Sequence, residues 1–126
     1  MSSINSKATA TFPEVVFMKS GKLLIKGRSI PSDVRDFYQP LIDWASELKI
    51  KHLIVDLELE YMNSASAKKL LYMLKILDIN VDVEKLTVRW HYEEGDEESL
   101  ISGQIFEKLL TRAEFRYTLH REAASS

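Results

Sequence analysis

The 126-residue sequence contains no cysteine and has only four glycines. Without cysteine, the chain cannot form disulfide bonds, thiolate zinc sites or iron–sulfur clusters, and it has no thiol nucleophile. The glycines, Gly21, Gly27, Gly95 and Gly103, do not form the phosphate-binding loops of common nucleotide-binding enzymes. The G-x-S-x-G motif of many serine hydrolases is also missing. These absences favour a protein that acts by binding rather than by catalysis.

Charge of one sign and long apolar runs are equally scarce. Lysine and arginine number 17, against 19 acidic residues, so the chain lacks the basic excess of a nucleic-acid-binding protein. No apolar run approaches the ~20 residues that cross a bilayer, and residues 1–11 lack the apolar centre of a signal peptide. We therefore expect a cytoplasmic protein that binds neither nucleic acid nor membrane.

The length and the 45% hydrophobic content are typical of one globular domain. We expect a single domain over residues 1–126, with flexible ends at 1–11 and 122–126. Residues 14–18 and 22–28 predict a β-hairpin that turns at Ser20-Gly21.

Three segments have helical periodicity. The first follows Ser32, a candidate N-cap, and contains Pro40, which we expect to kink or split it. Its apolar stripe is Val34, Phe37, Tyr38, Leu41, Ile42, Ala45 and Leu48. The second begins at Asn63-Ser64 with the stripe Ala67, Leu70, Leu71, Leu74 and Leu77, and the third spans 97–110 with Leu100, Ile101, Ile105, Leu109 and Leu110 facing inward.

Three further segments alternate between apolar and polar residues. These are 51–61, 85–92 and 115–119, and each is typical of a strand with one buried face. In 51–61 the apolar side runs from Leu53 to Tyr61, and in 85–92 it includes Trp90. The order of elements is therefore β-β-α-β-α-β-α-β.

This order predicts an α/β fold in which a mixed sheet winds in one direction, with the helices mainly on one face. Strands that are separated by helices pair in parallel, and a sheet covered on both faces would have continuous apolar strands rather than alternating ones. We expect the polar face to be more exposed than the apolar face. The polar set is Glu58, Glu60, Arg89 and His91, and the apolar set is Leu57, Leu59, Val88 and Trp90.

Several polar groups are candidates for chemistry. His52, His91 and His120 lack metal-ligand spacing, so we assign them structural or surface roles and expect neither a metal nor another cofactor. The acidic run 93–98 is typical of a helix start rather than a calcium loop. Asp56 and Glu58 lie on one strand face at ~6.5–7 Å spacing, so a small enzyme that uses Asp56, Glu58 or His91 is a third alternative.

Ser64 is the most informative candidate. It lies where a parallel strand ends and a helix begins, at the sheet edge where ligands and partners dock. The small residues after it leave its hydroxyl accessible. The competing interpretation is that Asn63 or Ser64 only caps the helix, which contributes about 1 kcal/mol.

The order of elements, with a serine at the start of the helix after the central strand, resembles the STAS domain of anti-sigma-factor antagonists. A closer resemblance is to the SiaC family of bacterial regulatory phosphoproteins. The stretches that carry it are Leu41-Ile42-Asp43-Trp44, then Leu59-Glu60-Tyr61-Met62-Asn63-Ser64-Ala65-Ser66, then Val88-Arg89-Trp90-His91-Tyr92.

The SiaC resemblance implies a non-enzymatic phospho-switch with a STAS-like fold. Ser64 matches the residue that a dedicated kinase phosphorylates in that family. A PP2C-type phosphatase removes the phosphate again. The unmodified form would bind and activate a diguanylate cyclase, which controls cyclic-di-GMP and biofilm growth. Tyr61, Asn63, Ser66 and Lys68 surround the site, with Ser66 the nearest alternative acceptor. The STAS resemblance leaves a second possibility, an anti-sigma-factor antagonist in a partner-switching cascade.

Overall fold

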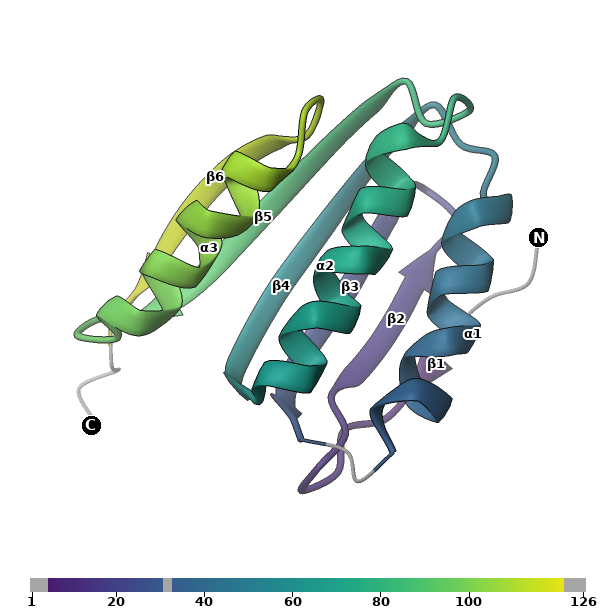
Figure 1. The fold of residues 1–126 in the computed structure, drawn as a ribbon. Coiled ribbons are helices and arrows are strands. Elements are labelled where there is room, and N and C mark those ends of the chain that lie inside the picture. Colours follow the sequence, from purple (N-terminus) through teal and green to yellow (C-terminus); the bar gives the residue numbers. More distant parts are fainter. Residues whose placement is uncertain (1–4, 31–32, 122–126) are drawn as a thin grey trace.

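A mixed six-stranded sheet and three helices make up the computed structural model, which describes residues 5–30 and 33–121 (Figure 1). The strands are β1 (Asn5–Ser6), β2 (Glu14–Met18), β3 (Lys22–Ser29), β4 (His52–Met62), β5 (Lys85–Glu93) and β6 (Glu114–His120). The helices are α1 (Val34–Glu47), α2 (Ser64–Ile79) and α3 (Glu97–Leu109). Within the described residues, no helix is long and apolar enough to cross a membrane.

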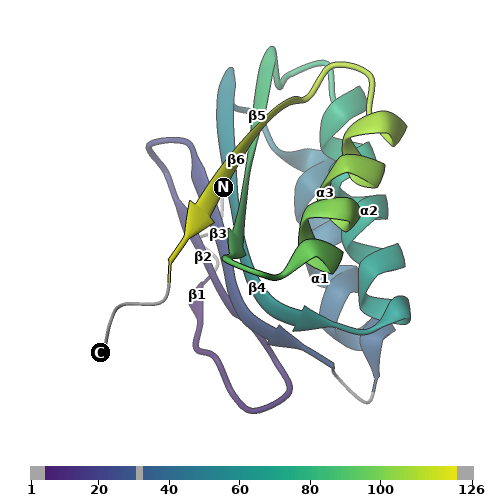
Figure 2. The ribbon, with the colours of Figure 1, turned by 90° about the vertical axis from the view of Figure 1, so that its left-hand side faces the viewer.

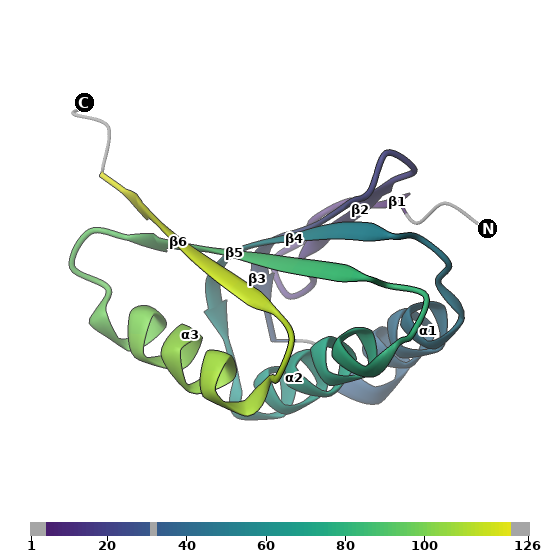
Figure 3. The ribbon, with the colours of Figure 1, turned by 90° about the horizontal axis from the view of Figure 1, so that it is seen from above.

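The strands lie in the sheet in the same order as in the chain, β1-β2-β3-β4-β5-β6. The first three pair antiparallel, and β3 to β6 pair in parallel. The β2–β3 turn depends on Gly21, whose φ of +112° disfavours other residues. All three helices cover the same face of the sheet (Figures 2 and 3). The prediction of a sheet wound in one direction with helices on one face is confirmed.

The core lies between this face of the sheet and the helices. The apolar side chains of the central strands are almost completely buried, and α1 and α2 pack side by side over them. Of the predicted apolar set, Leu57, Val88 and Trp90 are buried and Leu59 is half-buried. Of the polar set, Glu60 is exposed and the other three are half-buried, so the predicted contrast holds except at Leu59. Each large apolar side chain buried here contributes about 1.5–3 kcal/mol. Asp56 is an exception, since it lies on the polar face and is only 2% exposed.

The strand β4 changes its alternation near its end. Gly27 pairs with Leu59 and Arg28 pairs with Tyr61, so Glu60 is an extra residue in the ladder. Such a bulge reverses the side-chain alternation after it. The prediction that Tyr61 faces the core is therefore wrong, because Tyr61 is 53% exposed and Met62 packs against the core instead.

The helix α1 differs from its prediction at the N-cap, and of the two effects expected of Pro40 the split does not occur. Its N-cap is Asp33, whose side chain accepts a hydrogen bond from the Asp36 N–H at 3.1 Å, while the predicted cap Ser32 lies outside the described residues. Pro40 does not split α1, which is one continuous helix. The seventh residue of a helix loses a single backbone hydrogen bond to proline. The buried stripe of Tyr38, Leu41, Ile42, Trp44 and Ala45 holds the two halves together on the sheet.

Three of the five residues predicted to face inward from α3 do not, whereas Leu110 is buried in the core as predicted. Ile101, Ile105 and Leu109 are each about half exposed, and the contact with the sheet is made by Gly103 and Phe106. A Cβ atom on Gly103 would lie 2.9 Å from the Trp90 ring, so the missing side chain permits the close approach. The stripe with Gly103 and Phe106 has fewer apolar side chains than the predicted stripe, so hydropathy alone favours the wrong face.

The amino-terminal segment also contains an element that the sequence did not predict. Residues 1–11 were expected to be flexible, yet Asn5 and Ser6 pair with Val16 and Val15 as the edge strand β1. Two residues are too few for an alternation pattern, which is why this strand was missed. The predicted flexible tail 122–126 and residues 1–4 lie outside the described residues.

Candidate functional site

The site begins where β4 ends and α2 starts. Asn63 is the N-cap of α2, and its side-chain oxygen accepts a hydrogen bond from the Ser66 N–H at 2.8 Å. Its own N–H donates to the Ser29 carbonyl at 3.1 Å, which ties the cap to β3. Asn63 therefore fulfils the capping role, and Ser64 is the first residue of the helix with an exposed side chain. Capping does not use the Ser64 hydroxyl.

The Ser66 hydroxyl lies in the core. Ser66 is 0% exposed, and the Ser29 hydroxyl donates to it at 3.0 Å. The Ser29 hydroxyl also lies 2.6 Å from the phenolic oxygen of Tyr38, on α1. This buried chain of three hydroxyls joins the first turn of α2 to β3 and α1. Burial raises the pKa of Tyr38, although its hydrogen bonds partly offset the rise. A kinase cannot reach Ser66 in the folded protein.

The exposed neighbours of Ser64 come from both sides of the cap. Lys68 is exposed and lies four residues after Ser64, on the same face of α2. Tyr72 continues this face one further turn along and is 52% exposed. Tyr61, on the last part of β4, is exposed as well. Of the four residues predicted around Ser64, the structure brings Tyr61, Asn63 and Lys68 to the surface and buries Ser66.

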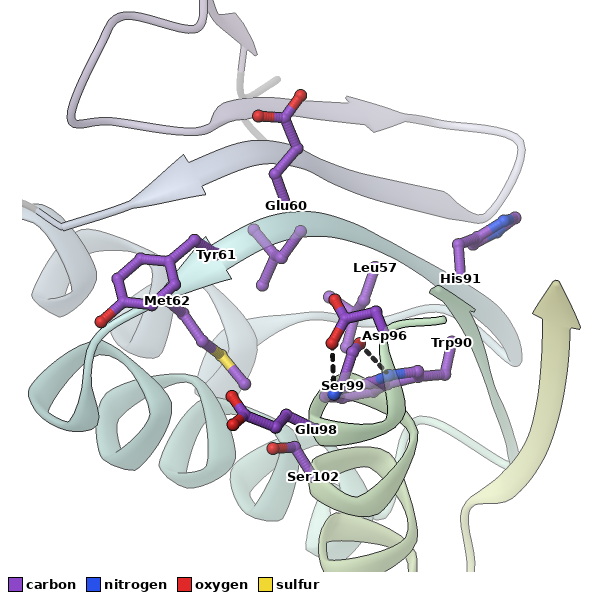
Figure 4. Close-up of a pocket in the computed structure, with 11 residues that line it drawn as sticks. Leu57, Glu60, Tyr61, Met62, Trp90, His91, Asp96, Glu98, Ser99 and Ser102 are labelled. Carbon is purple, nitrogen blue, oxygen red and sulfur yellow. Dashed lines mark hydrogen bonds between the residues drawn. The ribbon is translucent and has the colours of Figure 1, made fainter. Parts of the chain in front are cut away.

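A small pocket of about 110 Å³ lies beside this start of α2 (Figure 4). Its lining comes from the last residues of β4, from Trp90 on β5 and from the first turn of α3. The Trp90 indole donates to the Ser99 hydroxyl at 3.1 Å, and the Ser99 N–H donates to Asp96 at 3.0 Å. Asp96 and Glu98 give the α3 side of the pocket negative charge, whereas the Glu60 carboxylate points away from them (Figure 4).

The carboxylates considered for catalysis have a different role. Asp56 is buried and accepts hydrogen bonds from Arg89 at 2.7 and 2.8 Å and from His91 at 2.8 Å, while the Lys22 ammonium lies 3.2 Å away. Burial by itself raises the pKa of Asp56, but these partners outweigh it and lower the pKa to about 2. A carboxylate that is ionised and fully paired is a poor general base at neutral pH. Asp56 therefore holds three strands together beneath the polar face.

The fold brings two of the three histidines together and leaves the third apart. His52 is exposed at the start of β4, away from the others. His91 and His120 come from neighbouring strands, and their rings stack with Nδ1 of His91 2.7 Å from Nε2 of His120. Glu58 lies close to both. The sequence contains no local signal for this group, because its members lie on three different strands.

A model of the SiaC family of regulatory phosphoproteins matches residues 6–120. This chain belongs to the SiaC family. It is 26% identical over 102 residues to an uncharacterised protein of Pseudomonas aeruginosa strain UCBPP-PA14. This match covers 77% of this chain and 81% of that protein.

Solved SiaC structures from Pseudomonas aeruginosa have the same fold. One is SiaC in a crystal structure of the diguanylate cyclase SiaD in complex with its activator, with a TM-score of 0.79 and 22% identity. It covers 93% of this chain and 99% of the matched chain. A second is apo-SiaC, with a TM-score of 0.75, 22% identity and coverage of 94% and 99%. Membership of the SiaC family confirms the sequence-based expectation of a signalling phosphoprotein rather than an enzyme.

Proposed function

We propose that the protein is a phospho-switch controlled at Ser64 by a kinase and by a PP2C-type phosphatase. In this proposal, the unmodified form binds and activates a diguanylate cyclase, and phosphorylation ends that binding. The observation that carries the proposal is the exposed Ser64 hydroxyl at the first position of α2, in a chain of a family of regulatory phosphoproteins. Ser66, the nearest alternative acceptor, is buried.

The start of α2 is suited to hold a phosphate. The first N–H groups of a helix have no partner within it, and the helix dipole places positive charge there. The first turn of α2 contains no acidic residue, and Lys68 lies one turn further on. A phosphate on Ser64 therefore meets donors and one ammonium group without requiring a change of the fold.

The same phosphate would change what the surface can bind. It adds about −1.5 to −2 charges at neutral pH, at an exposed position where the first turn of α2 has no acidic residue. Ser64, Lys68 and Tyr72 lie at four-residue intervals along the exposed face of α2. Phosphorylation would make the Ser64 end of this face negatively charged. A partner that docks on this face loses affinity through repulsion and desolvation, while the core beneath stays intact.

The choice of a diguanylate cyclase as the partner is supported by the Pseudomonas aeruginosa protein. That SiaC is the activator of the diguanylate cyclase SiaD, with which it forms a complex. We extend the class of partner to this chain through shared family membership and fold. The prediction concerns the class of enzyme and not a specific cyclase.

The test uses the full chain with its cognate kinase, ATP and the cyclase encoded in the same genome. Mass spectrometry should find phosphate on Ser64, and Ser64→Ala should abolish labelling while it keeps cyclase binding and activation. Ser46→Ala is a matched control, because Ser46 is an exposed helical serine on α1, and it should behave as wild type. The phosphorylated protein should bind the cyclase more weakly by titration calorimetry.

Ser64→Asp should weaken cyclase binding less than phosphorylation does, because one carboxylate carries less charge than a phosphate. Phosphate on another residue, or equal affinity of both forms, would contradict the switch. Capture of an anti-sigma kinase in place of a cyclase would contradict the proposed partner and favour the partner-switching alternative.

A further inference from the structure

A cluster of potential metal ligands lies on the open face of the sheet, opposite the helices. One residue comes from each of three adjacent strands: Glu58 from β4, His91 from β5 and His120 from β6. One ligand atom of each residue lies within 4.8 Å of the other two. Two imidazoles and one carboxylate, with a fourth position left for water, form a known type of zinc site.

The strand register brings these residues together. Leu57 pairs with Trp90, so the next positions, Glu58 and His91, lie beside each other on the opposite face. His120 pairs with Glu93, two residues beyond His91, and its side chain therefore points to the same face as that of His91. Adjacent strands are about 4.8 Å apart, which is a suitable spacing for side chains that converge on one ion.

Asp56 orients the central ligand. Its carboxylate is paired with Lys22 and Arg89 and lies 2.8 Å from Nε2 of His91. The Nε2–H of His91 donates to this carboxylate, which leaves the lone pair of Nδ1 on the side of His120. A carboxylate that holds the second nitrogen of a ligating histidine is the usual arrangement around protein-bound zinc.

The two histidine rings are close enough for one zinc ion to replace the hydrogen bond between them. His91 Nδ1 and His120 Nε2 lie 2.7 Å apart, which is the distance of a hydrogen bond from one ring to the other. In a tetrahedral zinc site, two nitrogens at about 2.0–2.1 Å from the ion lie about 3.3 Å from each other. The His120 ring therefore has to move by about half an ångström, which is feasible because His120 is the last residue of β6.

The surroundings favour a cation. The cluster lies in a groove of about 450 Å³ on the polar face of the sheet. Four carboxylates and one lysine line this groove: Glu14, Glu58, Glu60, Glu93 and Lys26. The excess of negative charge attracts a divalent ion, and the open groove leaves space for water in the remaining coordination position.

We propose that Glu58, His91 and His120 bind one zinc ion, which links the edge strand β6 to β5 and β4. This site lies on the face of the sheet opposite α2, so it is independent of Ser64 and of the proposed switch. Imidazole ligands bind zinc more strongly than magnesium or calcium. The site should therefore discriminate against those two ions.

The experiment uses the full chain, freed of metal by chelation, and titrates it with zinc chloride by calorimetry. We expect one zinc per chain with a dissociation constant of about 10 μM or lower, and no heat from magnesium chloride. Cobalt chloride should give the visible absorption of a four- or five-coordinate site. Zinc should also raise the melting temperature in proportion to the logarithm of its concentration.

The variants separate this site from other histidines and carboxylates. His120→Ala and Glu58→Gln should each weaken zinc binding at least about tenfold, since loss of a supporting contact alone costs about 10–100-fold. His52→Ala and Glu47→Gln are the matched controls, at exposed positions that do not line the groove, and should change it less than about twofold. Both ligand variants retain the Asp56–His91 bond, and circular dichroism verifies their folding. Absence of zinc binding in the wild type, or binding that is unchanged in His120→Ala, would overturn the proposal.

Discussion

The helices α2 and α3 begin with the same local design. Each has an Asx N-cap whose side chain accepts a hydrogen bond from the third residue of the helix, Asn63 from Ser66 and Asp96 from Ser99. In each, that third residue is a serine whose hydroxyl is bonded to the body of the protein. Both helices follow neighbouring parallel strands and therefore start at the same edge of the sheet.

The two starts differ in charge. The first two residues of α3 are Glu97 and Glu98, whereas those of α2 are Ser64 and Ala65. The acids of α3 satisfy the positive end of its dipole permanently. The start of α2 lacks such charge and has an exposed hydroxyl in the equivalent position. Phosphorylation of Ser64 would supply to α2, reversibly, the charge that α3 always has.

The largest loss of unfolding free energy that we expect comes from removing the Trp90 side chain, on which the first turns of α3 pack. Trp90→Ala deletes a buried side chain that packs on Phe106 and Gly103 and donates to Ser99. Such a deletion costs about 3–5 kcal/mol of unfolding free energy. Ser99→Ala, which removes only the hydrogen bond, should cost about 1 kcal/mol. Urea unfolding measures both, and a loss below about 1 kcal/mol for Trp90→Ala would mean that α3 is held by other contacts.

A second prediction concerns the last turn of α2, where an acid faces the negative end of the dipole. Asp78 is buried and accepts hydrogen bonds from Thr111, Arg112 and Ala113. Burial by itself raises the pKa of Asp78, but these bonds outweigh it and hold the pKa below its usual 3.8. Asp78→Asn should lower the unfolding free energy by about 1–3 kcal/mol at neutral pH, since backbone donors lose a charged partner.

The pH dependence of this effect has a definite sign. Because the folded-state pKa is lowered, the charged Asp78 stabilises the fold fully above pH 3.8, and the contribution disappears as the pH falls through the folded-state value. The difference between wild type and Asp78→Asn should therefore shrink in urea titrations below pH 3.8. Asp82→Asn, at an exposed position nearby, is the control. A difference that is constant down to the lowest pH would contradict the role of the charge.

The sequence predicted most of the fold because alternation and helical periodicity agree with each other along the chain. It failed where the packed face has few apolar side chains, as on α3, and where a bulge shifts the alternation, as on β4. The face of α3 that contacts the sheet contains Gly103 and is not the predicted face. The bulge at Glu60 places Tyr61 on the exposed side of β4. Neither a glycine contact nor a bulge changes hydropathy, so a periodicity search cannot detect them.

The candidate site was predictable to a similar extent. The position of Ser64 follows from the strand–helix boundary, which the sequence marks clearly. The burial of Ser66 does not, because it depends on the Ser29 and Tyr38 hydroxyls from distant parts of the chain. The convergence of Glu58, His91 and His120 was missed for the same reason, since it results from the pairing of three strands.

A third prediction compares the two caps directly. Asn63→Ala and Asp96→Ala should each cost about 1 kcal/mol of unfolding free energy through loss of the capping bond. Asp96→Ala should cost a further 0.3–1 kcal/mol, approximately, because it also removes a charge from the helix start. High salt should screen only this additional part. Equal losses at low and high salt for both variants would show that the charge difference between the helices is of no consequence.

The smallest expected effect comes from exchanging charge between the two helix starts. Ser64→Glu should stabilise the protein by about 0.3–1 kcal/mol relative to Ser64→Gln, because only the charge differs between them and the start of α2 has no acid. Glu97→Gln should lose a similar amount from α3. Thermal unfolding at low ionic strength measures both, and 1 M salt should abolish them. If Ser64→Glu is instead less stable than Ser64→Gln, then the unfavourable effect of the charge at this position exceeds the attraction of the dipole. In that case a phosphate on Ser64 would weaken α2 as well as its interface, and the switch would act through the helix itself.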